Sequence, residues 1–183
     1  MDIKNKTVLV TGGASGLGQA TVEAVIAGGG NAVILDINEI NANKLINELG
    51  EDKVSFISTN IMEEEPVVNA INEIQEKFGA LHVAVNCAGT GYPGRILGRE
   101  APHPLDAFKL IINLNLVGTF NVMRIAAELM DKNEPGTSGD KGVIVNTASV
   151  AGYEGQIGQS AYSASKAGAV SYTHLTLPTS FLV

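Results

Sequence analysis

Short runs of apolar, often β-branched residues alternate with helical segments along most of the 183-residue chain. Runs of about four to eight such residues are typical of strands buried on both faces of a sheet. Strands that alternate with helices form a parallel sheet with right-handed crossovers. We therefore expect an α/β fold with a doubly wound parallel sheet. The expected strands are Lys6–Thr11, Gly30–Asp36, Lys53–Ser58, Leu81–Asn86 and Gly142–Asn146.

Helical periodicity fills most of the intervals between these strands. Apolar residues recur there every three or four positions, as in a helix with one buried face. One predicted helix follows Gly18 and ends at Ala27, and a last one begins near Ala161. Between them, three predicted helices span Glu39–Leu49, Glu63–Phe78 and Leu105–Lys132. At this length the chain is predicted to form one domain with a sizeable core.

The first predicted strand leads directly into a glycine-rich turn and then a helix. At such a helix start, backbone N–H groups and the helix dipole can receive a pyrophosphate, and glycines allow a sharp turn and close ligand approach. A glycine-rich turn alone can also be an ordinary βα loop, but its place after the first strand favours a dinucleotide site. The candidate cofactor residues here are Gly12, Ser15, Gly16, Leu17 and Gly18.

Asp36 ends the second predicted strand, 18 residues after Gly18. A carboxylate at this position can accept hydrogen bonds from both ribose hydroxyls of an adenosine and would repel a 2′-phosphate. The spacing is near the roughly 20 residues expected for that role. The alternative is a helix cap or a solvated turn aspartate. The sequence therefore predicts NAD rather than NADP as the cofactor.

A serine, a tyrosine and a lysine follow the fifth predicted strand. Ser149 comes just past the strand end, where parallel sheets bind ligands. Tyr162 and Lys166 are four residues apart on the following helix, so they share one face. An ammonium group beside a phenol favours the phenolate, and a serine hydroxyl can hold a substrate oxygen. The set predicts acid–base chemistry on an alcohol or ketone, with Ser149 and Tyr162 as substrate-binding residues.

Tyr-x-x-x-Lys alone is also common on helix surfaces that have no catalytic role. The combination of strand end, serine, thirteen-residue gap and Tyr-x-x-x-Lys is more restrictive, and it resembles the catalytic signature of the short-chain dehydrogenase/reductase family. The Gly-x-x-x-Gly-x-Gly spacing of Gly12–Gly18 resembles that family too. The resemblance implies a Rossmann-like fold and an enzyme that transfers hydride between NAD and a secondary alcohol or ketone.

The same resemblance assigns roles to four catalytic candidates. Tyr162 would be the general base in alcohol oxidation and the general acid in ketone reduction, and Ser149 would orient the substrate oxygen. Lys166 would favour the phenolate and, with Tyr162, bind the nicotinamide ribose. Asn115 matches the family's Asn-x-x-Gly element, which bends a helix and holds a water of the proton relay; Asn113 is the alternative.

Further cofactor positions are also carried over from the family. Asn60 and Ile61 follow the third strand, where family members usually carry an aspartate that contacts the adenine. Cys87, Ala88 and Gly89 belong to an Asn-x-Ala-Gly element that lines the ribose side of the cofactor. Because no histidine or basic residue adjoins Cys87 in sequence, we interpret it as a small wall residue.

The loops Asn133–Lys141 and Glu154–Tyr162 narrow the resemblance to the type II 3-hydroxyacyl-CoA dehydrogenases, also called type 10 hydroxysteroid dehydrogenases. That subfamily oxidises 3-hydroxyacyl-CoA thioesters with NAD, so an acyl-CoA thioester is the expected small-molecule partner. Alternatives within the family are a 3-oxoacyl thioester reductase and a hydroxysteroid or other alcohol dehydrogenase. An alternative of another class is a cofactor-binding scaffold without turnover.

The resemblance ends near Ala169, where the family would continue its helix and add two more strands. We expect residues 1–169 to be an incomplete NAD-binding domain and residues 170–183, with Pro178, to be a non-native tail. The isolated chain is then expected to be a poor enzyme, and the family's homotetramer is doubtful for it.

Composition excludes several classes of partner. A net charge of −7 and a pI near 4.9 argue against nucleic acid or an anionic membrane. No uninterrupted apolar run reaches the length of a membrane span, and the N-terminus lacks a signal-peptide pattern. Three scattered histidines give no metal site, and a single cysteine suits a reducing compartment. We therefore expect a cytoplasmic protein without a metal.

Overall fold

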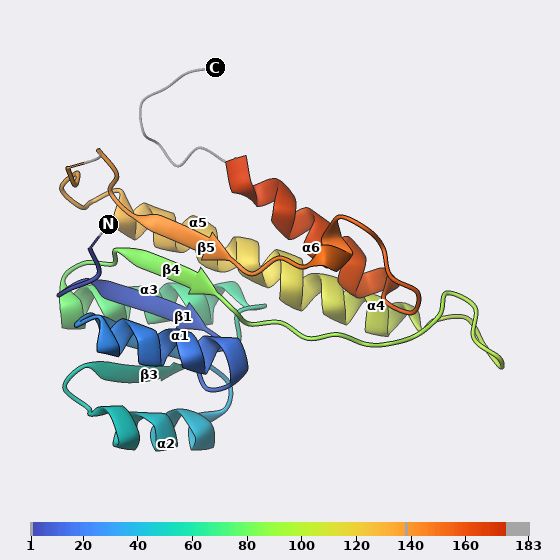
Figure 1. Cartoon of the computed structure of the whole chain (residues 1–183), viewed down its shortest axis with the longest axis horizontal. Helices are drawn as coiled ribbons and strands as arrows, with labels where there is room; N and C mark the ends of the chain where they lie inside the picture. Colours follow the sequence, from blue (N-terminus) through green and yellow to red (C-terminus); the bar gives the residue numbers. More distant parts are fainter. Residues whose placement is uncertain (1, 138, 175–183) are drawn as a thin grey trace.

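The computed structural model describes residues 2–137 and 139–174, and within them five parallel strands form one sheet in the order β3-β2-β1-β4-β5 (Figure 1). This confirms the predicted α/β class. Each strand ends at the predicted residue and begins one or two residues later, within the usual uncertainty of element boundaries. The strands are β1 Thr7–Thr11, β2 Asn31–Asp36, β3 Val54–Ser58, β4 Val83–Asn86 and β5 Val143–Asn146.

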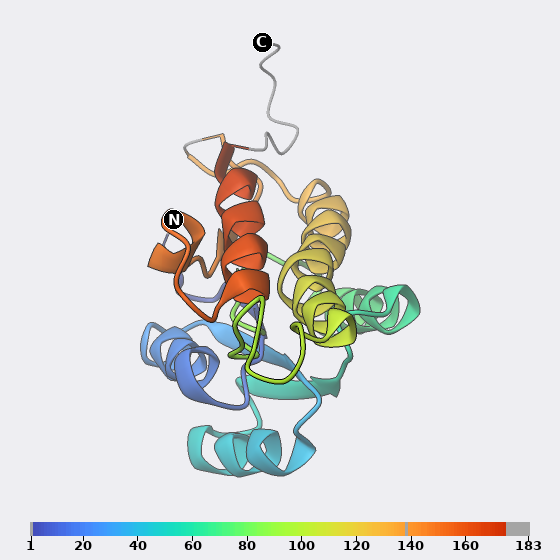
Figure 2. The ribbon, with the colours of Figure 1, turned by 90° about the vertical axis from the view of Figure 1, so that its right-hand side faces the viewer.

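Helices cover both faces of the sheet, as its apolar strands require (Figure 2). Side chains of α1 and α2 pack on one face, and side chains of α3 and α5 pack on the other. The final helix, α6, packs against α4. The helices are α1 Gly16–Ala27, α2 Glu39–Leu49, α3 Glu64–Phe78, α4 Leu105–Ile112, α5 Thr119–Met130 and α6 Ser160–Ser171.

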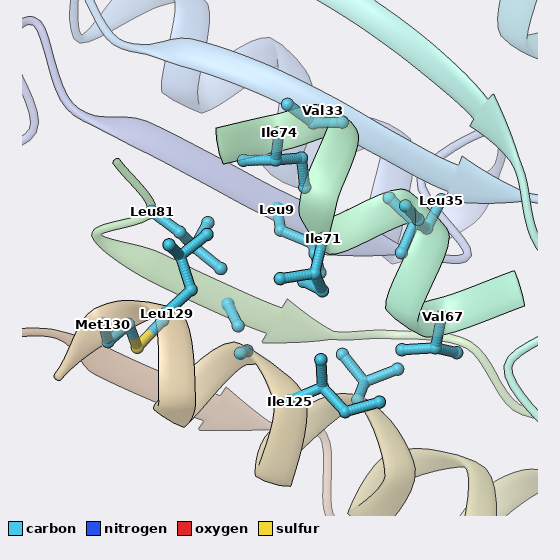
Figure 3. Packing of buried hydrophobic residues seen from close by; sticks show 14 of the residues in the cluster. Leu9, Val33, Leu35, Val67, Ile71, Ile74, Leu81, Ile125, Leu129 and Met130 are labelled. Atoms are coloured by element: carbon cyan, nitrogen blue, oxygen red, sulfur yellow. The ribbon is translucent and has the colours of Figure 1, made fainter. Parts of the chain in front are cut away.

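The core between the sheet and helices α3 and α5 holds the strands in place (Figure 3). Leu9 and Leu35 from the sheet, Ile74 from α3 and Leu81 before β4 are fully buried there. Burying each such side chain contributes about 1.5–3 kcal/mol relative to leaving it in water. The strand ends that carry the candidate site are thus fixed by packing.

The predicted helix Leu105–Lys132 is not uniform. A π-helical segment, Asn113–Gly118, separates α4 from α5, and the helix ends at Met130. The apolar periodicity continues through the segment, which is why the sequence predicts one helix. The wider turn leaves Asn115 buried at 1% exposure, facing the loop after β4.

The continuous stretch Leu105–Met130 is long and apolar enough, by length and composition, to cross a membrane. This does not contradict the expectation about uninterrupted apolar runs, because polar residues such as Asn113 and Asn121 interrupt the stretch. Half of its most apolar part is buried in the fold, and a helix in a protein core can be equally long and apolar.

The residues assigned to the tail fall partly within the described chain. Val170 and Ser171 continue α6, and Tyr172–His174 form one further helical turn. The helix is therefore about two residues longer than the predicted domain boundary at Ala169. Pro178 and the rest of the predicted tail lie outside the described residues.

Polar side chains tie three strands together at their carboxyl ends. The Thr11 hydroxyl donates to Asn86 Oδ1 at 3.4 Å, and Asn86 Nδ2 donates to Asn146 Oδ1 at 2.9 Å. The backbone N–H of Ala88 donates to the Thr11 hydroxyl oxygen at 3.1 Å. These bonds fix β1, β4 and β5 relative to one another at the edge where parallel sheets bind ligands.

At the amino ends of the strands, His82 connects the start of β1 to the start of β4. The Thr7 backbone N–H donates to His82 Nδ1 at 3.1 Å, which requires an unprotonated Nδ1. Burial lowers the pKa of His82, and the Lys6 charge lowers it further. The fold therefore favours the neutral imidazole.

This arrangement predicts a pH-dependent loss of stability. Because the folded pKa lies below the ordinary value of about 6.5, stability contributed by neutral His82 is complete above that value and is lost as pH falls through the folded pKa. His82→Asn keeps an acceptor for Thr7 but cannot titrate. Urea unfolding of both proteins from pH 8 to pH 5 should show a steeper loss for the unsubstituted protein; parallel curves would contradict the role of His82.

Candidate active site

A cleft of about 570 Å³ lies at the carboxyl ends of β1, β2, β3 and β4. It includes the switch point between β1 and β4, from which successive strands are added in opposite directions across the sheet. The residues predicted to contact the nucleotide from the first four strand ends all line it. They are Gly12, Ser15, Gly16, Leu17, Gly18, Asp36, Asn60, Ile61, Cys87, Ala88 and Gly89. Residues from four loops far apart in sequence are thus brought together in one cleft, and their contacts with a cofactor stay a prediction.

In the glycine-rich turn, Gly12 and Gly18 pack closely against the backbone, whereas Gly16 faces open space. Gly12 has a φ of +64°, and a Cβ there would lie 2.8 Å from the Ala88 backbone. A Cβ at Gly18 would overlap the Gly12 carbonyl oxygen. Nothing lies within 4 Å of a Cβ at Gly16, which has a φ of +53°. The free space before the start of α1 suits the pyrophosphate of a dinucleotide.

Asp36 braces this turn while facing the cleft. Its Oδ2 accepts from the Ala14 N–H at 3.0 Å, and its Oδ1 accepts from the Asn38 N–H at 2.9 Å. Each carboxylate oxygen has acceptor capacity left for a further donor such as a ribose hydroxyl. Asp36 therefore has the structural role in a turn that was the alternative interpretation. This role does not exclude a contact with the nucleotide, which stays a prediction.

Asn60 is engaged locally on both sides of its amide. Nδ2 donates to Glu63 Oε1 at 2.6 Å, and Oδ1 accepts from the Met62 N–H at 3.2 Å. These bonds shape the turn before α3. Contact with an adenine would have to use the remaining capacity of the amide, so the adenine role carried over from the family stays a prediction.

Cys87 lines the cleft as an intermediate-burial side chain. Burial raises the pKa of its thiol, and a hydrogen bond with Thr21 and the charge of Lys166 offset this in part. The thiol therefore stays protonated near neutral pH. A neutral thiol packs as a small apolar group, in keeping with the wall role predicted for it.

A neighbouring cleft of about 480 Å³ contains Ser149 and Tyr162. Ser149 follows β5, and its hydroxyl oxygen accepts from the Ala151 N–H at 3.2 Å, which fixes its orientation at the start of a short helical turn. Tyr162 lies in the first turn of α6. The remaining lining residues are Gly91, Tyr92, Pro93, Val150, Gln156 and Gln159.

Lys166 lies behind Tyr162 and is 6% exposed. Its Nζ donates to the Thr147 carbonyl oxygen at 2.6 Å and lies 3.3 Å from the Thr147 hydroxyl. The ammonium group is 5.8 Å from the centre of the Tyr162 ring. Burial lowers the pKa of Lys166, with a smaller opposing effect from Cys87. Thr147, which lies between Asn146 and Ser149, thus holds the Lys166 ammonium group, a role that the sequence motifs do not indicate.

Asn115 reaches the site through its side chain. Oδ1 accepts from the Thr90 N–H at 2.9 Å, and Nδ2 donates to the Thr90 carbonyl oxygen at 2.8 Å and to the Ser165 hydroxyl at 3.1 Å. A Cβ at Gly89 would lie 3.1 Å from Asn115 Oδ1 and 3.9 Å from Lys166 Nζ, so both groups face the same wall of the cofactor cleft. Asn113 makes no comparable contact among the described bonds.

The loop Thr90–Pro104 forms the outer side of the second cleft. Its Gly94 N–H donates to the Gly158 carbonyl oxygen at 2.8 Å, which joins it to the loop before α6. His103 packs against the Tyr92 ring with the ring centres 5.5 Å apart, so it is a packing residue of this loop. Neither it nor His82 lines the two clefts described above.

The fold and this pair of clefts are typical of nucleotide-binding α/β enzymes, and comparison with known proteins identifies the chain as an oxidoreductase. Residues 6–177 match the family model for short chain dehydrogenases, and the chain belongs to that family. It is similar to 3-hydroxyacyl-CoA dehydrogenase type-2 of Drosophila melanogaster, with 48% identity over 93% of this chain and 68% of the relative. The human protein of the same name is 43% identical over 93% of this chain and 66% of its own length.

Solved structures support the same assignment. The structure of 3-hydroxyacyl-CoA dehydrogenase type-2 from Mycobacterium avium matches with a TM-score of 0.86 and 42% identity, over 92% of this chain and 66% of that one. A short chain dehydrogenase from Mycobacterium smegmatis matches with a TM-score of 0.84 and 30% identity, over 94% of this chain and 70% of that one. The family and fold predicted from the motifs are confirmed. The chain spans about two thirds of the length of these proteins.

The glycine turn gives a testable steric prediction. Alanine is favoured over glycine in a helix by about 1 kcal/mol, but at Gly18 its methyl group would overlap the Gly12 carbonyl. Gly18→Ala should therefore lower the melting temperature and weaken NADH binding at least about tenfold, as one lost contact of about 1.4 kcal/mol would do. Gly155→Ala, where a Cβ meets nothing within 4 Å, is the control. Unchanged NADH affinity in Gly18→Ala, measured by fluorescence titration, would refute the steric argument.

Proposed function

We propose that the protein is an NAD-dependent oxidoreductase that interconverts a secondary alcohol and a ketone, with a 3-hydroxyacyl-CoA thioester as substrate. The observation that carries this proposal is the position of Ser149 and Tyr162 in one cleft beside the nucleotide cleft. Gly89 and Thr90 line the nucleotide cleft, and the next residue, Gly91, lines the other, so the two sites adjoin.

The residues of the second cleft supply the proton chemistry. In alcohol oxidation, the Tyr162 phenolate would accept the proton of the substrate hydroxyl, and in ketone reduction the Tyr162 hydroxyl would return it. Ser149 would hold the substrate oxygen by a hydrogen bond. The Lys166 ammonium, held at Thr147, would favour the phenolate through its positive charge. The water relay assigned to Asn115 belongs to this proposal.

The residues of the first cleft fit a dinucleotide. The turn Gly12–Gly18 would hold the pyrophosphate, Asp36 the adenosine ribose, and Asn60 and Ile61 the adenine. Cys87–Gly89 would line the second ribose, and Lys166, which is not among the lining residues, would bind it next to Gly89, where a Cβ would lie 3.9 Å from its Nζ. When bound, the nicotinamide accepts or supplies the hydride. NAD is preferred in this proposal because the Asp36 carboxylate would repel a 2′-phosphate, and no lysine or arginine lines the described cleft.

The substrate class is supported by the relatives named 3-hydroxyacyl-CoA dehydrogenase type-2. Oxidation of 3-hydroxybutyryl-CoA tests it directly, with free 3-hydroxybutyrate and a hydroxysteroid as competing substrates. Preferential turnover of a hydroxysteroid would favour the other alcohol dehydrogenases of the family, and cofactor binding without any turnover would favour a scaffold. The cytoplasmic location and the homotetramer are proposals as well.

The role of Tyr162 predicts a large loss of turnover on removal of one oxygen. In a protein extended to the length of the relatives, which is also the protein for the later measurements of turnover, Tyr162→Phe should lower kcat for 3-hydroxybutyryl-CoA oxidation by about 100- to 10,000-fold, the usual contribution of an acid–base group. NADH affinity should change little, because the ring is kept. Tyr153→Phe removes the hydroxyl of an exposed tyrosine outside both clefts and is the matched control. Near-normal turnover by Tyr162→Phe would place the acid–base group elsewhere.

The role of Asp36 predicts a change in cofactor preference. The unsubstituted protein should bind NADH more tightly than NADPH, and Asp36→Ala should erase the difference, because the repulsion of the 2′-phosphate is removed. Fluorescence titration with both cofactors gives the ratio. Asp52→Ala, an exposed carboxylate at the amino end of β3, should leave the ratio unchanged. Equal affinity for the two cofactors in the unsubstituted protein would overturn the assignment.

A further inference from the structure

Ser165 is a fully buried hydroxyl in the middle of α6, between Tyr162 and Lys166. A buried polar group in a helix is costly unless it is hydrogen-bonded, so its partners show what holds it there. Its Oγ donates to the Tyr162 carbonyl oxygen at 2.7 Å and accepts from Asn115 Nδ2 at 3.1 Å. The first bond lies within α6, whereas the second leaves the helix.

The bond to Asn115 completes a bridge between three segments. The amide of Asn115 also holds both backbone groups of Thr90, at 2.9 and 2.8 Å. Because Oδ1 faces an N–H donor and Nδ2 faces two acceptors, the orientation of the amide is fixed. The bridge therefore runs from Tyr162 through Ser165 and Asn115 to the loop that separates the two clefts.

The close packing of α6 on the π-helical segment Asn113–Gly118 allows the bond between Ser165 and Asn115 to form. A Cβ at Gly168 would lie 2.6 Å from the Leu116 side chain, so α6 and the π-helical segment Asn113–Gly118 are in contact where this leucine packs on a glycine. Ala161 and Ala169 on α6 are buried as well. A hydroxyl is the size of polar group that this interface can hold without separating the helices.

We propose that Ser165 is a positioning residue that acts through Asn115 to hold the Tyr162–Lys166 face of α6 in register with the Gly89–Thr90 wall of the cofactor cleft. The inference rests on the proposed function and adds a residue to its site. It matters for rate because Lys166 Nζ and Asn115 Oδ1 face the same point at Gly89. A displacement of about 1 Å between catalytic groups and bound reactants can cost about 100-fold in rate.

The test compares two serines that make the same bond within α6. Ser171 also donates to the carbonyl oxygen three residues earlier, at 2.6 Å to Gly168, but it is exposed and has no described bond to another segment. Ser165→Ala should lower kcat for 3-hydroxybutyryl-CoA about tenfold or more, with KM changed less than about twofold. Ser171→Ala should leave both unchanged. A purely structural role of Ser165 would lower the melting temperature and leave kcat per folded molecule unaltered.

A double-mutant cycle tests whether Ser165 acts through Asn115. In an Asn115→Ala background, Ser165→Ala should cause little further loss of kcat and little further fall in melting temperature, because the bridge is already broken. Equal losses in both backgrounds, or unaltered kcat in Ser165→Ala, would overturn the proposal. If Ser165→Ala does not fold, Ser165→Cys, which has a weaker donor of similar size, takes its place in the cycle.

The two readouts separate this inference from the proposed function. Absence of turnover in the unsubstituted protein counts against the proposed function alone, and the cycle in melting temperature still measures the coupling of Ser165 and Asn115. Additive shifts in that cycle would then overturn the inference. Turnover that is normal in Ser165→Ala but lost in Tyr162→Phe would leave the proposed function standing and remove Ser165 from its site.

Discussion

The hydrogen bonds of the Asn86 side chain are the constraint on which both clefts depend. Parallel strands end at a common edge with unpaired backbone groups, and this edge is also where ligands bind. The Asn86 side chain joins Thr11 on one side and Asn146 on the other. The backbone carbonyl oxygen of Asn86 accepts from the Thr147 hydroxyl at 2.9 Å. A buried network of this kind is stabilising when its members are all bonded, and it fixes the strand ends from which the loops that line the two clefts continue.

Lys166 is connected to this network through Thr147. A buried ammonium is costly without partners, and Thr147, which is itself held by Asn86, supplies its carbonyl oxygen. Burial still lowers the pKa of Lys166, so the protein keeps the charge next to Tyr162 at the expense of desolvation. The Lys166 side chain is thus connected, through Thr147, to an asparagine at the end of β4.

The strand ends could be predicted from sequence because each follows from a local apolar pattern, and the structure confirms them. The glycine turn and the Ser149–Tyr162–Lys166 set are also local patterns; the structure gathers the nucleotide candidates of the first four strand ends in one cleft, and their roles stay predictions. The π-helical segment was not predictable in this way, because apolar periodicity continues across Asn113–Gly118. Thr147 and Ser165 were missed because their roles come from contacts across the fold, to residues 19 and 50 positions away.

The bond between Asp36 and the Ala14 N–H has a consequence for engineering. In the proposed site it makes one carboxylate part of two subsites, since Asp36 lines the cleft where the ribose would bind and also braces the turn that would hold the pyrophosphate. A substitution that admits a 2′-phosphate would also release the turn, so cofactor preference and overall nucleotide affinity cannot be adjusted independently at this position. A redesign for NADP would need a second change that gives Ala14 a new acceptor.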